Sequence, residues 1–166
     1  MMGSTNEVNA VAIETVATMT DAAKLDDLLW RVLWEPLSLP RDVRHVFPVD
    51  GEAIELVATV KGRVVGGLVA LLTSDTEVEL RHIAVASDAQ HCGNGRRLIA
   101  ELVRFVVPRG CRRIHVIARN TSAHFFGQLG FRTAPGETPD HPVFRKQGIT
   151  FELLERTIGP TGAGDA

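Results

Sequence analysis

A glycine-rich stretch near the middle of the chain has the residue types and spacing of an anion-binding loop. Residues 79–95 read ELRHIAVASDAQHCGNG, so an apolar strand runs into a Gln-x-x-Gly-x-Gly loop that begins at Gln90. Glycine allows tight turns and a close approach of backbone N–H groups to a ligand. A helix beginning at about Asn94 would add unpaired first-turn donors and the positive end of its dipole. The pattern predicts a cradle for a phosphorylated ligand.

Two arginines in the first turn of that helix support the same interpretation. Arg96 and Arg97 oppose the helix dipole, at a cost of about 0.3 to 1 kcal/mol each where exposed, and a bound anion would offset that cost. The alternative is an ordinary strand-to-helix turn with two solvated arginines. A dinucleotide fold is not indicated, because Leu98 replaces the third glycine of Gly-x-Gly-x-x-Gly and no Gly-Lys-Ser/Thr P-loop occurs.

A second motif follows the loop at a compatible distance. After a strand expected at 113–119, the chain reads Asn120-x-x-Ala123-x-Phe125-Phe126-x-x-x-Gly130-Phe131. Together with the glycine-rich loop, this segment resembles the GCN5-related N-acetyltransferase (GNAT) family. The resemblance is strongest over residues 77–132, and the expected order of elements extends it over residues 10–158.

Composition indicates one soluble domain. The chain has 166 residues, of which 45% are hydrophobic, and a formal net charge of -2. A chain of this length is expected to form one hydrophobic core. Its slightly negative net charge argues against a protein that binds nucleic acid or anionic membranes. No apolar run approaches the ~18 residues of a membrane span, and the N-terminus lacks the basic and apolar regions of a signal peptide. A cytoplasmic location is therefore expected.

The two cysteines do not indicate a disulfide framework. Cys92 is either a reactive thiol, favoured by the helix N-terminus and the arginines beside it, or a bystander in the loop. His91 and Cys92 have no further ligands at the spacing of a zinc site, so no metal is expected.

We expect a single domain over residues 10–158, with polar tails at 1–9 and 159–166. The expected fold class is α/β (α+β). The resemblance implies a single mixed, mostly antiparallel central sheet of about seven strands with helices on both faces. The expected strands cover 11–18, 52–60, 63–72, 76–85, 113–119, 131–134 and 149–158. The first expected helix begins at a cap on Thr20 or Asp21, and the others cover 41–47, 96–107 and 122–129.

The strand at 76–85 contains a break in its side-chain alternation. Val78 and Leu80 put the apolar face on even positions, whereas Ile83 and Val85 put it on odd ones. An extra residue near Arg81 or His82, a β-bulge, would cause this, and burial of both faces is the alternative. The resemblance implies a bulge that re-aims backbone groups toward the acyl thioester.

The resemblance also implies acetyl-coenzyme A as the cosubstrate. Its pyrophosphate would lie on the N–H groups of residues 92–96, and its pantetheine arm along residues 83–85, like an added strand. Asn120 and Phe126 would flank the arm near its sulfur, and an amine would attack the thioester directly. The implied cofactor-binding residues are Ile83, Ala84, Val85, Gln90, His91, Cys92, Gly93, Asn94, Gly95, Arg96, Asn120, Ala123 and Phe126.

Two residues are candidates for the base that deprotonates the amine. Glu79 matches the strand glutamate that serves as base in some members of the family, but its reference pKa of ~4.3 requires burial, and Arg81 would lower that pKa unless the bulge turns it away. The alternative is a surface ion pair. His82 has a more suitable reference pKa of ~6.5, or it is a hydrogen-bonded core histidine.

The general acid cannot be transferred from the family. Many relatives have a tyrosine where this chain has Phe126, and the chain contains no tyrosine. Solvent, Ser122 or a residue of the 135–148 loop would have to protonate the departing thiolate. A module that binds coenzyme A with little or no turnover, and a nucleotide-binding protein of another kind, are therefore alternatives to an acyltransferase.

The acceptor is left open by the sequence. Segments 29–47 and 135–148, which would wall the acceptor groove, mix acidic and basic residues without a clear sign. A small-molecule amine is the first expectation, and a protein lysine or N-terminus the second. A strand at 149–158 with an exposed edge would allow a homodimer.

Overall fold

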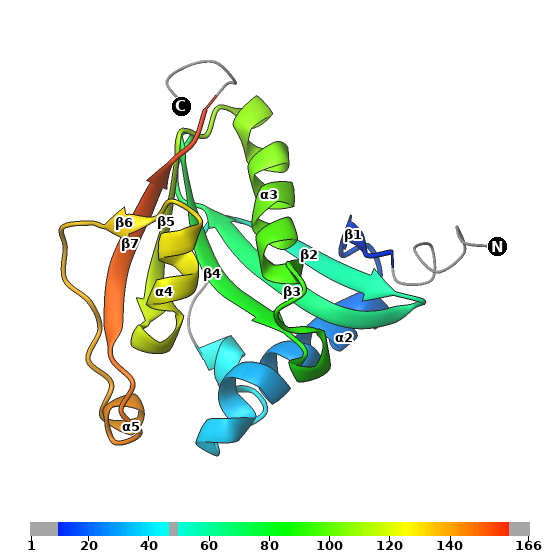
Figure 1. The fold of residues 1–166 in the computed structure, drawn as a ribbon, viewed down its shortest axis with the longest axis horizontal. Helices are drawn as coiled ribbons and strands as arrows, with labels where there is room; N and C mark the ends of the chain where they lie inside the picture. Colours follow the sequence, from blue (N-terminus) through cyan, green and yellow to red (C-terminus); the bar gives the residue numbers. More distant parts are fainter. Residues whose placement is uncertain (1–9, 47–49, 160–166) are drawn as a thin grey trace.

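The computed structural model describes residues 10–46 and 50–159, which form a seven-stranded sheet in the order β1-β2-β3-β4-β5-β7-β6. All neighbouring strands are antiparallel except β4 and β5 (Figure 1). The predicted fold class is confirmed. In chain order the elements are β1 (Ala12–Thr15), α2 (Met19–Leu29), β2 (Glu52–Val60), β3 (Arg63–Leu72), β4 (Glu77–Val85), α3 (Asn94–Val106), β5 (Arg113–Arg119), α4 (Ala123–Gln128), β6 (Arg132–Thr133), α5 (Pro142–Arg145) and β7 (Phe151–Thr157).

The predicted bounds of the β2–β3 hairpin and of β5 agree with the structure, but the first helix starts earlier than expected. Its cap is Thr18, not Thr20 or Asp21. Thr18 has an extended backbone, and its hydroxyl accepts a hydrogen bond from the Asp21 N–H at 3.1 Å. This satisfies one of the first-turn donors that a helix leaves unpaired. The helix then continues through a π-helical turn, Trp30–Trp34.

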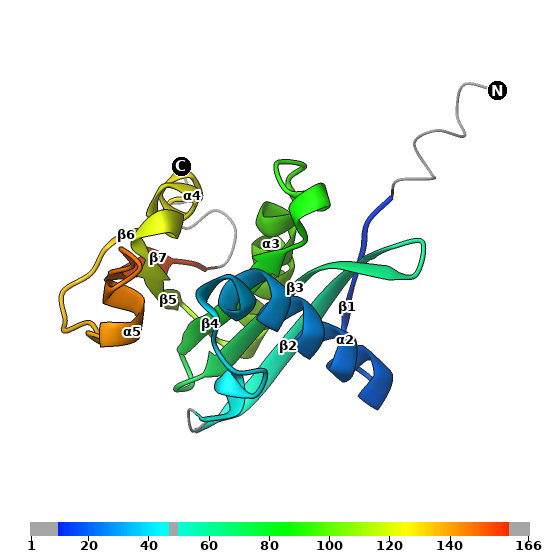
Figure 2. The ribbon, with the colours of Figure 1, turned by 90° about the horizontal axis from the view of Figure 1, so that it is seen from below.

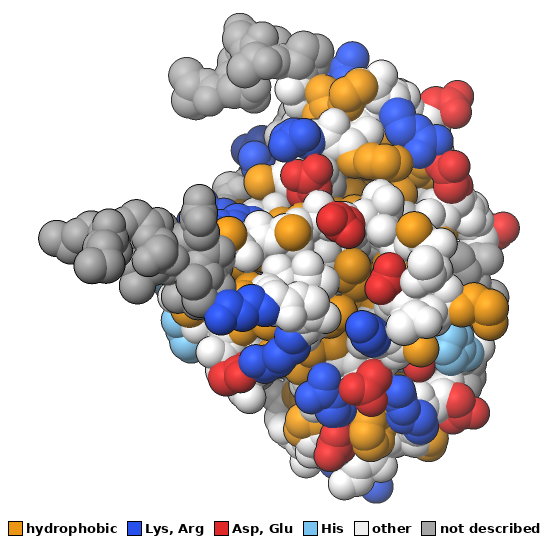
Figure 3. Space-filling view, turned by 90° about the vertical axis from the view of Figure 1, so that its right-hand side faces the viewer, with side chains coloured by type: hydrophobic (Ala, Val, Ile, Leu, Met, Phe, Trp, Pro, Cys, Tyr) orange, Lys and Arg blue, Asp and Glu red, His pale blue; other side chains and the backbone are white. Residues whose placement is uncertain are grey.

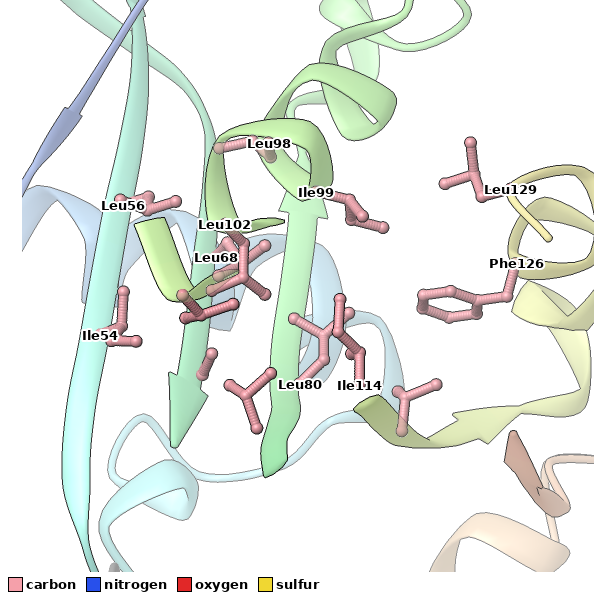
Figure 4. Close-up of a cluster of buried hydrophobic side chains, with 14 of the residues drawn as sticks. Ile54, Leu56, Leu68, Leu80, Leu98, Ile99, Leu102, Ile114, Phe126 and Leu129 are labelled. Carbon is pink, nitrogen blue, oxygen red and sulfur yellow. The ribbon is translucent and has the colours of Figure 1, made fainter. Parts of the chain in front are cut away.

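The larger hydrophobic core lies between the sheet and the pair α3 and α4. Leu98, Ile99 and Leu102 of α3 lie over the strands, and Phe126 of α4 and Leu129, which follows α4, point toward the same cluster (Figure 4). The α3 residues recur at helical spacing, so one stripe of the helix is buried, as predicted. This packing fixes the position of the α3 N-terminus relative to β4.

A smaller core covers the opposite face of the sheet. Leu25 and Leu29 of α2 pack there against Val57 and Ala84, so α2 and α3 enclose the sheet from both sides (Figure 2). A Cβ at Gly67 of β3 would overlap a Leu25 methyl group. The absence of a side chain at this position lets α2 lie close to the sheet.

The predicted β-bulge is present in β4. Along the β3–β4 pair, Val69 faces His82 but Ala70 faces Leu80, so Arg81 is the extra residue. The bulge reverses the alternation, because Leu80 packs in the α3 core whereas Ala84 packs in the α2 core. The interpretation that the break in parity marks a bulge is confirmed.

The parallel pairing of β4 with β5 is short. It runs from the pair Glu77 and Arg113 to the pair Leu80 and Val116, although both strands continue well beyond these residues. Figure 1 shows the two strands diverging from this point. Over the described part of the chain, residues 83–85 therefore pair with β3 along one edge and have no strand along the other.

The strand expected at 149–158 is not the outermost strand of the sheet. It forms β7, which lies between β5 and the two-residue strand β6. Because β6 pairs only with Leu154 and Glu155, it covers a small part of the outer edge of β7. The homodimer stays a prediction.

Some sequence expectations fall where the structure gives no description. The tail predicted at 1–9, the tail predicted at 159–166 except for its first residue, and the end of the helix predicted at 41–47 lie outside the described residues. A 3₁₀ segment, Val43–Val46, occupies the described part of that helix.

The surface carries charges of both signs. On the face shown in Figure 3, lysine and arginine side chains lie among aspartate and glutamate side chains, with hydrophobic side chains between them. Within residues 10–46 and 50–159, no helix combines the length and the apolar character needed to cross a bilayer.

The stability of the fold should depend strongly on the α3 core. Leu102 is fully buried in the large cluster, so Leu102→Ala is expected to lower the free energy of unfolding by about 2 to 5 kcal/mol through lost burial and a residual cavity. Urea denaturation measures this change. Arg104→Ala, on the exposed face of the same helix, is the control and should change it by less than about 0.5 kcal/mol.

Candidate functional site

Two adjoining cavities follow the divergence of β4 from β5. The first, of about 520 Å³, is called the loop cavity and is lined by Val32, Leu33, Ile83, Ala84, Val85, Ala89, Gln90, His91, Gly93, Asn94, Gly95, Arg96, Thr121, Ser122, Phe125, Gln128 and Leu129. The second, of about 410 Å³, is called the cleft cavity and is lined by Leu33, Trp34, Glu79, Leu80, Arg81, His82, Ile83, Val116, Ile117, Arg119, Ser122, Phe126, Pro139, His141, Phe144 and Phe151. Leu33, Ile83 and Ser122 line both cavities and mark where they meet.

A larger hollow lies elsewhere on the molecule. It has a volume of about 660 Å³ and is lined by the start of α2 and the end of the β2–β3 hairpin, including Met19, Lys24 and Arg63. None of the residues predicted from the sequence to form the site lines it. Size alone would point to a different region from the sequence, because most of the residues predicted to form the site line the two smaller cavities.

The glycine-rich loop ends in a helix N-terminus without a side-chain cap. The helical hydrogen bonds begin with Arg97 N–H, which donates to Gly93 O at 3.0 Å, so the donors just before it have no intrahelical partner. His91 and Gly93 adopt left-handed backbone angles, with φ of 65° and 82°. A non-glycine residue at positive φ is strained, and such strain gathers at binding sites.

Two side-chain amides hold the loop in this shape. Gln90 Nε2 donates to Val85 O at 2.9 Å, and the buried Asn94 donates through Nδ2 to Ala89 O at 3.0 Å. Both bonds return from the loop to the chain that leaves β4. The loop is therefore preorganised with its N–H groups at the end of the open edge of β4.

The two glycines of the motif do different things. Gly93 supplies the left-handed turn, and a Cβ there would meet no atom within 4 Å. A Cβ at Gly95 would lie 2.9 Å from Cζ of Phe125. Gly95 therefore lets the Phe125 ring of the second motif pack against the start of α3, and the two motifs are joined by this contact.

Most of the predicted cofactor-binding residues line the loop cavity, with four exceptions. Cys92 and Ala123 line neither cavity, and the Cys92 thiol is exposed and donates to Gln90 O at 3.5 Å. Phe126 lines the cleft cavity instead, where it is also part of the core and packs edge-to-face on Phe131, with ring centroids 5.3 Å apart.

Asn120 is the fourth exception. Its side chain bridges to the chain that enters β7: Nδ2 donates to Gly148 O, and the Thr150 N–H donates to Oδ1, both at 3.1 Å. Both atoms of the amide are thus engaged, and Asn120 lines neither cavity. In this structure Asn120 anchors the end of β5 to the start of β7.

The candidate base Glu79 lies in the cleft cavity. Its side chain is mostly buried, and Oε1 lies 3.7 Å from Arg81 Nη1. The bulge therefore does not turn Arg81 away from Glu79, as the sequence allowed. The carboxylate therefore forms an ion pair in the wall of the cavity, where both side chains are mostly buried, rather than on the open surface.

The second candidate, His82, lies in the same cavity in a different environment. Burial, together with the positive charges of Arg44, Arg81 and Arg119, lowers its pKa to about 3. The ring stands edge-on to Trp34, with centroids 5.0 Å apart. His82 is therefore a neutral imidazole with low proton affinity at pH 7.

The sequence analysis missed Arg119, the last residue of β5, which lines the cleft cavity. Its Nη2 donates to Leu33 O at 2.8 Å, and its guanidinium carbon lies 5.4 Å from the centre of the Phe144 ring. Burial lowers its pKa. The position at the carboxyl end of a central strand was a usable signal, but the contacts with Leu33 and Phe144 come from distant parts of the chain.

Among the residues that the structure describes, no group of three or more His, Cys, Asp or Glu side chains is placed to hold an ion.

The family model of the Acetyltransferase (GNAT) family matches residues 19–131, which contain both motifs and most of the two cavities. The chain belongs to the GNAT family. No curated protein matches this GNAT acetyltransferase.

Solved structures of similar fold cover nearly the whole domain. An aminoglycoside 6'-N-acetyltransferase complexed with coenzyme A is 19% identical, with a TM-score of 0.72 over 90% of this chain and 98% of its own. The ribosomal-protein-S18-alanine N-acetyltransferase from Escherichia coli is 20% identical, with a TM-score of 0.70 over 95% and 99%. PaiA N-acetyltransferase from Thermoplasma acidophilum, in complex with coenzyme A, is 11% identical, with a TM-score of 0.67 over 89% and 99%. At these identities the likeness shows the GNAT fold.

The buried state of His82 in this GNAT protein should appear in the pH dependence of stability. Its pKa is about 3 when folded and ~6.5 when unfolded, so the unfolded chain takes up the proton first and stability falls as the pH drops below ~6.5. Between pH 7.5 and 5, the wild type should lose about 2 kcal/mol more than His82→Gln, measured by urea denaturation. His124→Gln, on the exposed side of α4, is the control and should follow the wild type; equal pH dependence of the wild type and His82→Gln would contradict the expectation.

Proposed function

We propose that this GNAT protein is an N-acetyltransferase that transfers the acetyl group of acetyl-coenzyme A to a primary amine within a ternary complex. One observation carries the proposal. The strand edge left open where β4 diverges from β5 runs from the uncapped N-terminus of α3 to the cleft cavity that holds Glu79. A long thioester substrate and an amine would meet where the two cavities join.

The loop cavity fits the cosubstrate chemically. Free N–H groups at the start of α3, with Arg96 beside them, suit a diphosphate. The open edge of residues 83–85 offers backbone donors and acceptors to the amides of a pantetheine arm, in the manner of an added strand. Acetyl-coenzyme A supplies the activated acetyl thioester.

Glu79 is the proposed base. An amine must lose a proton before or during attack, and the carboxylate in the cleft cavity can accept it directly or through water. The amine nitrogen bonds to the acetyl carbon, the carbon–sulfur bond breaks, and the electron pair leaves with the sulfur as thiolate. His82 is the weaker candidate, because the burial that lowers its pKa to about 3 also makes it a poor proton acceptor.

The departing thiolate does not require a strong acid. An alkyl thiol has a pKa of ~8.5, so leaving it unprotonated at pH 7 forgoes only about 2 kcal/mol. The proton taken from the amine is available to return to the sulfur. Ser122, at the junction of the two cavities, is placed to relay it.

A small-molecule amine is the preferred acceptor. The cleft cavity of about 410 Å³ lies within the usual range for small ligands. Structural neighbours include enzymes named for an aminoglycoside and for a ribosomal-protein alanine, so a protein amine is the alternative to be tested in the same panel. Cytoplasmic location and dimer formation are further parts of the proposal that need direct measurement.

The assignment of the base can be tested with Glu79→Gln. Loss of a general base typically reduces the rate by about 10²- to 10⁴-fold, so kcat should fall by that amount while the affinity for acetyl-coenzyme A stays unchanged. Thiol release during turnover measures the first quantity, and calorimetric titration the second. Glu77→Gln is the matched control, because Glu77 lies on the same strand, pairs with Arg113 and lines neither cavity. Coenzyme A binding without turnover of any amine by the wild type would indicate a binding module instead.

The loop can be tested with Gly93→Ala. The left-handed φ of Gly93 costs an alanine about 1 to 2 kcal/mol, so the loop should relax and the affinity for coenzyme A should fall about ten-fold. Gly130→Ala is the matched control. Its φ is 86°, a Cβ there also meets nothing within 4 Å, and it lines neither cavity, so it should lose similar stability and keep its affinity. Equal affinities in calorimetric titrations of the two variants would argue against the loop as the binding site.

A further inference from the structure

The charge balance of the cleft cavity is informative about the acceptor. Its lining contains one carboxylate, Glu79, and two arginines, Arg81 and Arg119. Arg81 is paired with Glu79, and His82 is neutral because burial holds its pKa far below 7. The positive charge of Arg119 is therefore not balanced by a carboxylate in the cavity wall.

The surroundings of Arg119 suit the binding of an anion. It is partly buried, and no carboxylate among the described residues forms an ion pair with it. A guanidinium has five N–H donors, and Arg119 uses one of them on Leu33 O. Contact with Leu33 and with the face of Phe144 holds the group in place, so its remaining donors are preorganised for a bidentate acceptor such as a carboxylate.

The rest of the cleft wall is mainly apolar and aromatic. Trp34, Phe126, Phe144 and Phe151 line it from four different segments of the chain. Such a wall favours a flat or branched apolar group by burial. A polyol or a chain of ammonium groups would lose water there without finding partners.

We propose that the cleft cavity selects acceptors that carry a carboxylate and an apolar or aromatic group next to the amine, that is, apolar amino acids, with Arg119 binding the carboxylate. This inference rests on the proposed function and names its substrate class. The same positive charge in the cavity wall repels polycationic acceptors such as aminoglycosides and polyamines, which the proposal therefore excludes.

The test compares acceptors that differ only in the carboxylate. Phenylalanine, leucine, tryptophan and methionine are each assayed against their carboxamides, together with kanamycin and spermine, and each kcat/KM is corrected for the fraction of neutral amine. We expect the carboxylates to be preferred by about ten- to hundred-fold, the usual effect of a hydrogen-bonded charge, and the polycations to be inert.

A binding measurement makes the test independent of turnover. The protein saturated with coenzyme A is titrated with N-acetylphenylalanine and with its carboxamide, which represent the two products. The carboxylate should bind at least ten-fold more tightly. Arg119→Gln should reduce this preference to about one, and Arg119→Lys, which keeps the charge but not the bidentate geometry, should retain part of it. Arg104→Gln, on the exposed side of α3, is the control and should keep the full preference.

The outcomes separate this inference from the proposed function. Equal binding of acid and amide, or a preference for the amide, kanamycin or spermine, overturns the inference even when acetyl-coenzyme A is consumed. Unchanged discrimination in Arg119→Gln also overturns it. Failure of the protein to bind coenzyme A overturns the proposed function instead. If Arg119→Gln does not fold, the wild-type panel and Arg119→Lys still decide the matter.

Discussion

The early end of the pairing between β4 and β5 is the constraint on which the site depends. After Leu80 and Val116 the strands separate, and the backbone of residues 83–85 loses a sheet partner on one side. Unpaired backbone groups are costly when buried, so this edge has to face a cavity that water or a ligand can fill. The bulge at Arg81 lies just before these residues. Its extra residue changes which side chains of β4 face each core. Two cavities therefore lie where continued pairing of β4 with β5 would otherwise have closed the sheet.

The electrostatics of the cleft follow from what surrounds this opening. Burial and three neighbouring arginines hold His82 neutral, while Glu79 keeps a charge-compensating contact with Arg81. Arg119 is held by a backbone carbonyl and an aromatic ring rather than by a carboxylate. A partly buried cation without a counter-ion is costly in a folded protein, and this cost is the basis for the proposal that Arg119 binds an anion. At the start of α3, which has no side-chain cap, N–H groups rather than side chains form the proposed diphosphate site of the loop cavity.

Much of the fold was predictable because its signals are local. Alternation and a turn glycine defined the β2–β3 hairpin, a break in parity revealed the bulge, and helical spacing defined α3. The prediction failed at the start of α2, where Thr18 caps the helix in place of Thr20 or Asp21. Thr18, Thr20 and Asp21 can all cap a helix there, and the backbone angles that decide among them depend on where β1 ends.

The sequence by itself determined the family, the glycine-rich loop, the candidates for the base and the lack of a tyrosine acid, because each depends on residue type and short spacing. Only the tertiary structure decided which other residues they contact and how deeply they are buried. It placed Asn120 on the chain entering β7, Gly95 under the Phe125 ring, and Arg119 against Leu33. These contacts join segments far apart in the chain, and the burial and charge that set the chemistry of a side chain come from all the elements packed around it.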